Sequence, residues 1–287
     1  MTAPTPLPEV NAVLAELVAG WREILGLNLI GAYLQGSFVL GDFTQTSDVD
    51  FLVVIASEIE APVLARLQVM HARIHRQSSY WAQHLEGSYA TAAVIRRLTD
   101  EPRDPPGESP RLPSWRDPET GMPPGSYPFL FLGNGADNLR RSEHDNSKVM
   151  RWMVRECGIV LHGPHPATLI DHIAGDELRA EVKANVPIYV GRYVSGQSVI
   201  DAVWRQAFFV TLLCRMLHTL ETGRIHSKKA GTEWALQTLE PQWQGLITRA
   251  AATWATQQAM WMNRPNDSEV ETTIGFMRYA INFCTTK

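Results

Sequence analysis

Residues 36–55 of the chain read GSFVLGDFTQTSDVDFLVVI, and this stretch decides the fold. It begins with a Gly-Ser pair and ends with the apolar run 51–55, which is typical of a buried strand. Because successive side chains of a strand point to opposite faces, Asp48 and Asp50 are expected to share one face. The apolar segment 29–34 predicts a neighbouring strand that ends just before the Gly-Ser pair.

This arrangement joins a phosphate-holding turn to a pair of acids. Two carboxylates a few Å apart repel each other unless a cation lies between them, and Mg²⁺ prefers such oxygen ligands. We therefore predict that Asp48 and Asp50 are metal ligands. Backbone N–H groups at the turn attract phosphate, so Gly36 and Ser37 are predicted to bind ATP, with Ser47 as a further donor. Each part alone is common in ordinary turns, but the combination indicates the active site of a nucleotidyltransferase.

Two parts of the chain resemble a known family. Segments 34–37 and 47–53 resemble the signature of the DNA polymerase β-like nucleotidyltransferases, specifically the aminoglycoside adenylyltransferases that modify streptomycin and spectinomycin. Arg215, with segment 222–235, is similar to the region in which those enzymes carry an arginine and a lysine that reach the ATP phosphates. The match assigns this role to Arg215 and Lys228. The resemblance implies Mg²⁺-dependent transfer of AMP from ATP to a hydroxyl group of a small cationic, aminoglycoside-like acceptor, with release of pyrophosphate.

A third carboxylate is needed to take the proton from the attacking hydroxyl group. Glu86 is the candidate, because the chain between Asp50 and Glu86 has room for one helix, 59–77, before a predicted strand at 89–95. The family carries its catalytic glutamate at about this distance, which implies that Glu86 is both the base and a metal ligand. Gly87-Ser88 departs from an uninterrupted strand, and a solvated glutamate in a turn is the alternative.

The sequence predicts an α+β protein with two domains. Residues 1–137 are expected to form the nucleotidyltransferase domain, a small mixed sheet with helices on one face. A Pro- and Gly-rich insertion at about 99–125 is predicted to be irregular. Residues 138–287 are expected to form an all-α bundle that closes on the nucleotide and the acceptor. Its clearest helical periodicity is carried by Val203, Ala207, Val210, Cys214 and Leu217.

Composition narrows the class of protein. The chain has 287 residues and a net charge of −4, and no basic cluster interleaved with aromatic residues, so a nucleic-acid partner is not expected. No apolar run reaches membrane-spanning length, and residues 1–6 lack the features of a signal peptide. The 3 cysteines are far apart and predicted to be reduced. We expect a cytoplasmic monomer without a membrane partner.

The acceptor is the least determined part of this prediction. Family members that modify streptomycin and spectinomycin have an acid on the approach to the helix that carries the arginine. Ten residues before Arg215 this chain has Arg205, and its nearest acid is Asp201. This difference argues against streptomycin. Glu143, Asp145 and Asp201 are the acids we would place nearest a cationic acceptor, although each is also typical of a solvated helix start.

Other readings remain open at the level of sequence. An adenylyltransferase of the antitoxin-like type would modify a protein, and a nucleotide-binding module without turnover would need to have lost its base. Arg215 interrupts an apolar run, so an ion pair with Glu221 or Glu233 would also explain it.

Overall fold

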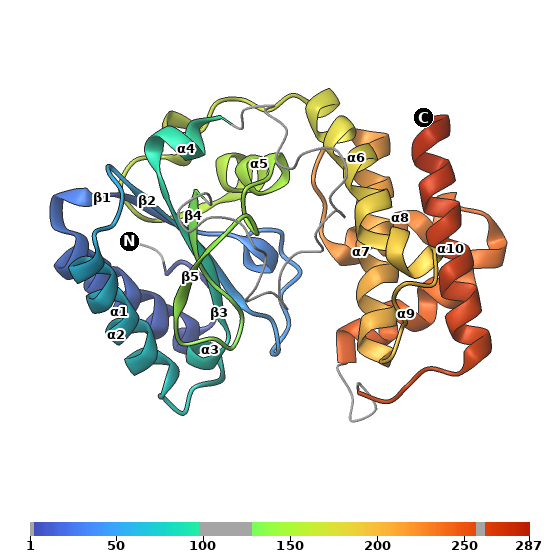
Figure 1. Ribbon diagram of the computed structural model, residues 1–287, viewed down its shortest axis with the longest axis horizontal. Helices are drawn as coiled ribbons and strands as arrows, with labels where there is room; N and C mark the ends of the chain where they lie inside the picture. The colour runs from blue at the N-terminus through green and yellow to red at the C-terminus, as the bar shows by residue number, and fades with distance from the viewer. Residues whose placement is uncertain (1–2, 98–127, 257–261) are drawn as a thin grey trace. The chain divides into compact units, whose positions relative to one another are not determined.

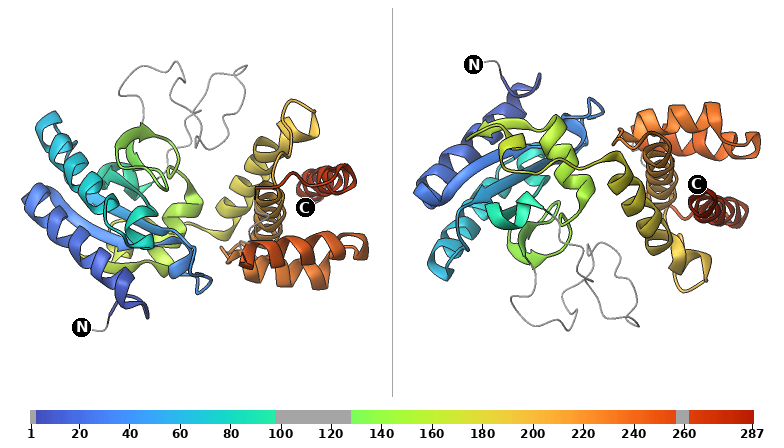
Figure 2. Two further views of the ribbon diagram at one scale, coloured as in Figure 1. Left: turned by 90° about the horizontal axis from the view of Figure 1, so that it is seen from below. Right: turned by 90° about the horizontal axis from the view of Figure 1, so that it is seen from above.

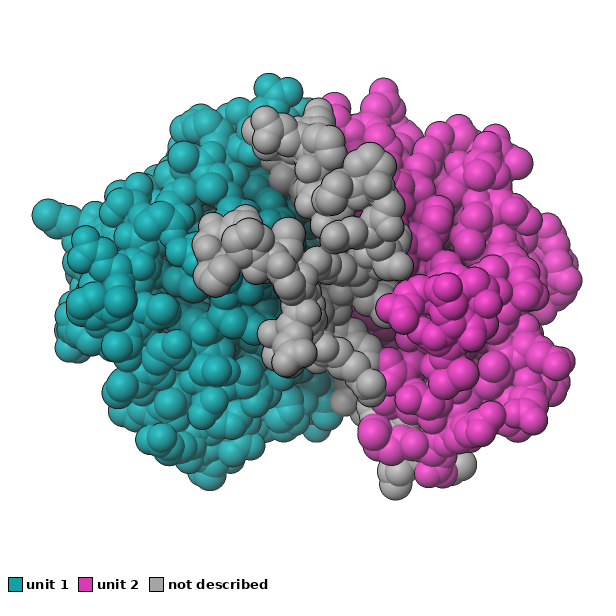
Figure 3. Space-filling model, in the orientation of Figure 1, with its two compact units in different colours: residues 1–108, 113–172 teal, residues 109–112, 173–287 magenta. Residues whose placement is uncertain are grey.

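The chain folds into two compact units, shown in different colours in Figure 3. The computed structural model describes residues 3–97, 128–256 and 262–287. Of these, residues 3–97 and 128–172 belong to unit 1, and residues 173–256 and 262–287 belong to unit 2. The predicted insertion at about 99–125 lies outside the described residues.

Unit 1 is built around a mixed β-sheet (Figure 1). The sheet order is β5-β4-β3-β2-β1-β6; β2 and β3 are parallel, and the other neighbouring pairs are antiparallel. The strands are β1 (Leu29–Leu34), β2 (Val49–Ile55), β3 (Leu85–Thr91), β4 (Phe129–Leu132), β5 (Leu139–Ser142) and β6 (Ile159–His162).

Helices cover both faces of this sheet, whereas the sequence predicted one face. Val49, Phe51 and Val53 point into the larger apolar cluster, with α1 and α2 along that face (Figure 2). Leu52 and Val54 point into a second cluster with α4 and α5. The helices are α1 (Pro8–Leu25), α2 (Ala61–His75), α3 (Tyr80–Gln83), α4 (Ala92–Arg96) and α5 (Lys148–Cys157), with 3₁₀ turns η1 (Gly26–Asn28), η2 (Gly36–Phe38) and η3 (Pro166–Thr168).

The strand predicted at 89–95 is misplaced. β3 begins at Leu85 and ends at Thr91, whose side chain accepts a hydrogen bond from the Val94 N–H at 3.3 Å and so caps α4. Gly87 lies within β3 and does not interrupt it. A Cβ atom at Gly87 would lie 2.3 Å from the carbonyl oxygen of Phe51, so glycine makes room for the neighbouring strand.

Unit 1 continues to residue 172, whereas the sequence placed the domain boundary after residue 137. Residues 138–172 were expected to be helical, but they contain β5 and β6 as well as α5. β6 returns to the far edge of the sheet, where Ala32 pairs with His162. Strands of four residues carry too little alternation to be distinguished from irregular chain.

Unit 2 is helical, as predicted. Its core is formed largely by α7, where the periodic residues Val210, Cys214 and Leu217 are fully buried. None of the helices in the described ranges has the length and apolarity needed to cross a lipid bilayer. The elements are α6 (Gly175–Val194), α7 (Val203–Thr222), α8 (Lys228–Thr238), η4 (Pro241–Trp243), α9 (Gln244–Thr256) and α10 (Asp267–Thr286).

Candidate active site

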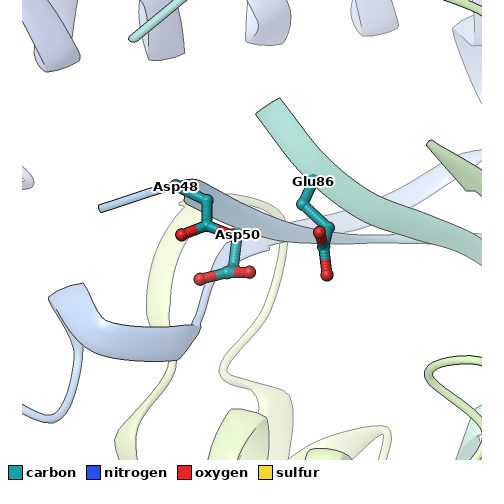
Figure 4. Close-up of side chains that lie close together, drawn as sticks. All are labelled: Asp48, Asp50 and Glu86. Atoms are coloured by element: carbon teal, nitrogen blue, oxygen red, sulfur yellow. The ribbon is translucent and has the colours of Figure 1, made fainter. Parts of the chain in front are cut away.

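The pairing of β2 with β3 brings the three predicted acids together. In this parallel register Asp50 lies directly opposite Glu86, and paired residues of neighbouring strands point to the same face. Asp48 precedes the strand by one residue and joins them (Figure 4). One carboxylate oxygen from each of the three residues lies within 4.8 Å of the others, and all three side chains are partly buried. Such an oxygen cluster suits a hard divalent cation.

The Gly36 turn lies directly against this cluster. Gly36 has a φ of +68°, and a Cβ atom there would lie 1.9 Å from Oδ2 of Asp50. Only glycine therefore permits both the backbone conformation and the close approach. The neighbouring Ser37 hydroxyl is buried and has no hydrogen-bond partner among the described residues. An orphaned donor beside an acid cluster fits a phosphate oxygen as its missing partner.

Ser47 has a structural role that the sequence did not predict. Its hydroxyl oxygen accepts a hydrogen bond from the Thr44 N–H at 2.8 Å and closes the turn that leads to Asp48. The Tyr80 hydroxyl group donates to the carbonyl oxygen of Thr46 at 2.7 Å and holds the same turn. The contact of Ser47 with phosphate stays a prediction.

Asn134, in the turn between β4 and β5, contacts two of the acids. Its backbone N–H donates to Oε2 of Glu86 at 3.1 Å, and its side-chain amide donates to Oδ2 of Asp48, also at 3.1 Å. Sequence reasoning missed this residue. Gly133 and Gly135 on either side of it mark a turn, but no spacing in the sequence indicates that the turn faces the acids.

His144 is a second residue that the sequence did not reveal. Its Nε2 lies 3.2 Å from Oε1 of Glu86, and its ring stacks on Phe131 at 4.4 Å between centroids. Burial lowers the pKa of His144, but the hydrogen bond to Glu86 and the charges of Asp145 and Glu86 outweigh it and raise that pKa overall. The contact therefore favours the imidazolium form, which offsets part of the negative charge of the acids.

Asp145 is largely covered, and its Oδ1 lies 4.0 Å from Nε2 of His144. The Ser88 hydroxyl donates to its Oδ2 at 2.6 Å, and 13% of its side chain is exposed. Burial raises the pKa of this carboxyl group, while the charge of His144 opposes the shift. Asp145 is therefore largely covered and already paired with Ser88, which weakens its candidacy as a partner for a cationic acceptor.

A pocket of about 250 Å³ opens beside Glu86. Its walls combine an aromatic face, two asparagine amides and the charged groups of Glu86, Arg140 and His144. The residues that line it are Glu86, Phe131, Gly133, Asn134, Ala136, Asn138, Arg140 and His144.

The two cationic residues predicted to bind phosphate both belong to unit 2. Arg215 lies on α7 and Lys228 is the first residue of α8. A Cβ atom at Gly231 would lie 2.6 Å from Cα of Arg215, so α8 approaches α7 closely one turn after Lys228. Arg215 is thereby held beside the beginning of α8. Glu221, one of its two candidate structural partners, pairs with Lys287 at 2.9 Å.

Arg205 forms an ion pair with Asp201, which precedes α7. Its Nε donates to Oδ1 of Asp201 at 2.7 Å, and 8% of the Arg205 side chain is exposed. The guanidinium group also lies over the Trp204 ring, 4.6 Å from its centroid. Asp201 is therefore already paired with a cation, which weakens its candidacy as a partner for a cationic acceptor.

Family models match both parts of the chain. Residues 14–91 match the model described as a nucleotidyltransferase domain. Residues 168–280 match the model described as the C-terminal domain of aminoglycoside adenylyltransferase. The first match contains the Gly36 turn and all three acids, and the second contains Arg215 and Lys228.

Individual relatives agree with these matches. The chain is 25% identical over 224 residues to spectinomycin 9-adenylyltransferase of Staphylococcus aureus, covering 76% of this chain and 75% of that protein. It is 22% identical over 230 residues to the enzyme of the same name from Campylobacter jejuni, covering 80% and 79%. The fold is similar to the crystal structure of spectinomycin adenyltransferase AAD(9) from Enterococcus faecialis with ATP and spectinomycin. In that comparison the TM-score is 0.67 at 15% identity, and the alignment covers 94% of this chain and 98% of the other.

Proposed function

We propose that this chain, which is an aminoglycoside adenylyltransferase-like protein with an N-terminal nucleotidyltransferase domain, transfers AMP from ATP to a hydroxyl group of an aminoglycoside-like acceptor. The observation that carries the proposal is the cluster of Asp48, Asp50 and Glu86 against the Gly36 turn. Asp48, Asp50 and Glu86 repel one another at this distance, so a bound cation explains their clustering better than a contribution to stability does.

In unit 1, the three acids would bind the metal ion and the Gly36 turn would bind the phosphates of ATP. Bound Mg²⁺, held by Asp48, Asp50 and Glu86, would neutralise negative charge on the triphosphate and on the departing pyrophosphate. The Gly36 backbone and the Ser37 hydroxyl, with Ser47 as a further donor, hold phosphate oxygens of ATP. These contacts orient the α-phosphorus toward Glu86.

Glu86 acts as the general base. It accepts the proton of the acceptor hydroxyl group while the hydroxyl oxygen attacks the α-phosphorus of ATP. The new phosphorus–oxygen bond forms as the bond to the bridging oxygen breaks, and pyrophosphate leaves with that electron pair. Asn134 and His144 hold the two oxygens of the Glu86 carboxylate at 3.1 and 3.2 Å and so keep it oriented.

Arg215 and Lys228 are assigned to the triphosphate. A guanidinium and an ammonium group stabilise the negative charge that develops on the departing pyrophosphate. Both family resemblance and their common placement at the α7–α8 contact support this assignment. The enzyme is expected to act as a cytoplasmic monomer, where ATP is supplied.

Spectinomycin is the first acceptor to test, because the relatives at 22% and 25% identity carry its name. Streptomycin is disfavoured, because this chain has Arg205 in the segment where the streptomycin-modifying members of the family carry an acid. The nearest acid, Asp201, is paired with Arg205. Purified protein should be incubated with Mg·ATP and each aminoglycoside in turn. Mass spectrometry then detects the acceptor that gains one adenylate, and a coupled assay detects pyrophosphate.

Glu86→Gln is the matched control. It keeps the shape of the side chain but removes the proton acceptor, so turnover should fall by roughly 10² to 10⁴ while ATP binding persists. Near wild-type turnover in Glu86→Gln at saturating substrates would remove Glu86 from the mechanism. Adenylate that appears on a protein band and on no aminoglycoside would instead identify a protein acceptor. ATP binding without any transfer would identify a nucleotide-binding module.

A further inference from the structure

We propose that Trp254 and Phe208 position the Lys228 ammonium group for the triphosphate. These two rings, named here the aromatic corner, lie on α9 and α7 and are not among the residues assigned to the nucleotide above. The inference rests on the proposed function, because it concerns how Lys228 performs its role there.

The geometry of the aromatic corner is specific. Nζ of Lys228 lies 3.6 Å from the ring centroid of Trp254 and 5.1 Å from that of Phe208. The two ring centroids are 5.9 Å apart, and their planes are inclined by 48°. The ammonium group therefore contacts two aromatic faces at once, at distances where the ring quadrupole attracts a cation.

The location of Lys228 on its helix suggests that the side chain serves a ligand. Ser227 caps α8, since its hydroxyl oxygen accepts a hydrogen bond from the Ala230 N–H at 3.0 Å, and Lys228 follows as the first helical residue. The beginning of a helix carries partial positive charge, so a lysine there does not stabilise the helix. The ammonium group and the helix end both favour an anion.

The two ring faces restrict where the ammonium group of Lys228 can lie. A ring face attracts the ammonium group through its quadrupole and leaves the positive charge in place. A lysine side chain also loses much rotamer freedom when it binds a ligand. Rings that restrict the side chain beforehand reduce that loss and so strengthen binding.

Both rings are themselves anchored. Phe208 and Trp254 are half-buried and pack against the main apolar cluster of unit 2. The close approach of Gly231 to Arg215 fixes α8 against α7 at the same place. The corner is therefore built into the packing of the three helices.

A double-mutant cycle tests the proposal. The Mg·ATP dissociation constant is measured by titration calorimetry for the wild type, Trp254→Leu, Trp254→Phe, Lys228→Ala, and Lys228→Ala combined with Trp254→Leu. Trp254→Leu should weaken binding by about 3- to 10-fold, whereas Trp254→Phe should recover most of that loss because it retains a ring face. In the Lys228→Ala background, Trp254→Leu should have no further effect. Melting temperatures verify that each variant is folded.

The possible failures are distinguishable. An equal loss from Trp254→Leu in both backgrounds would overturn the proposal, because the ring would then act on packing or on the nucleotide directly. A Trp254→Leu variant with unchanged affinity, beside a weakened Lys228→Ala, would overturn the positioning role and leave Lys228 on the triphosphate. Unchanged affinity in Lys228→Ala would remove Lys228 from nucleotide binding and overturn both.

Discussion

At the scale of single residues, the carboxylates of Asp48, Asp50 and Glu86 repel one another, and a bound cation would relieve that repulsion. Three carboxylates lie within 4.8 Å of one another. Asn134 donates hydrogen bonds to Glu86 and Asp48, and Nε2 of His144 lies 3.2 Å from the other carboxylate oxygen of Glu86. These donors reduce the repulsion but cannot replace a divalent cation, whose charge meets all three acids at once.

Replacing Asp48 and Asp50 together by Asn should abolish Mg²⁺-dependent binding of ATP and leave the fold intact. The stability of the double variant should be equal to or slightly above that of the wild type, because the change removes like-charge repulsion and no apolar contact. Calorimetry with Mg·ATP measures binding, and thermal unfolding measures stability. A folded double variant that binds Mg·ATP with wild-type affinity would contradict the assignment of the metal site.

At the scale of elements, the parallel pairing of β2 with β3 determines where the acids of the active site lie. The register places Asp50 opposite Glu86, and it is maintained only if Phe51 can lie against Gly87. A methyl group at Gly87 would lie 2.3 Å from a backbone oxygen of β2, which a side-chain rotation cannot relieve. The glycine that looked like an interruption of the strand is what permits the strands to pair closely.

Gly87→Ala should therefore destabilise the protein by about 1 to 3 kcal/mol, the usual cost of overpacking. It should also lower turnover, because a shifted β3 moves Glu86 away from Asp50. Gly191→Ala is the control: it lies in α6, where an added Cβ atom meets nothing within 4 Å, so stability should hold or rise slightly. Denaturant unfolding compares the two variants. A Gly87→Ala variant as stable as Gly191→Ala would contradict the steric argument.

The same elements show what sequence can and cannot predict. Strand 29–34 was predicted with the bounds that the structure has, because a six-residue apolar run that ends at a Gly-Ser turn is a strong strand signal. β5 and β6 are four residues each and carry no such pattern. Asn134 and His144 reach Glu86 through pairings between distant segments, and sequence spacing holds no information about such contacts.

At the scale of the whole molecule, each unit has its own apolar packing, and unit 1 has two apolar clusters, one on each face of its sheet. The larger cluster of unit 1 packs against the imidazole of His71, whose charge depends on pH. His71 is 1% exposed; its Nε2 lies 2.7 Å from the Tyr89 hydroxyl oxygen, which accepts a hydrogen bond from Trp21 Nε1 at 2.6 Å. The other ring nitrogen of His71 has no partner among the described residues. Burial lowers the pKa of His71 to about 3.

This shift fixes the direction in which stability depends on pH. In the unfolded chain His71 binds a proton near its ordinary pKa of about 6.5, whereas in the folded protein it stays neutral down to about pH 3. Between these values the unfolded state holds the extra proton. Lowering the pH below 6.5 should therefore reduce the free energy of unfolding, by up to about 1.4 kcal/mol per pH unit from this group.

His71→Gln should remove this contribution, because glutamine can bond to the Tyr89 hydroxyl group but does not titrate. The expected result is that the free energy of unfolding of the variant falls less steeply than that of the wild type between pH 6.5 and pH 4, whatever its absolute value. Urea unfolding at a series of pH values measures both slopes, and the other titrating groups, present in both proteins, cancel in the difference. Parallel slopes for wild type and His71→Gln would mean that the core of unit 1 admits the protonated ring, and that burial does not suppress its ionisation.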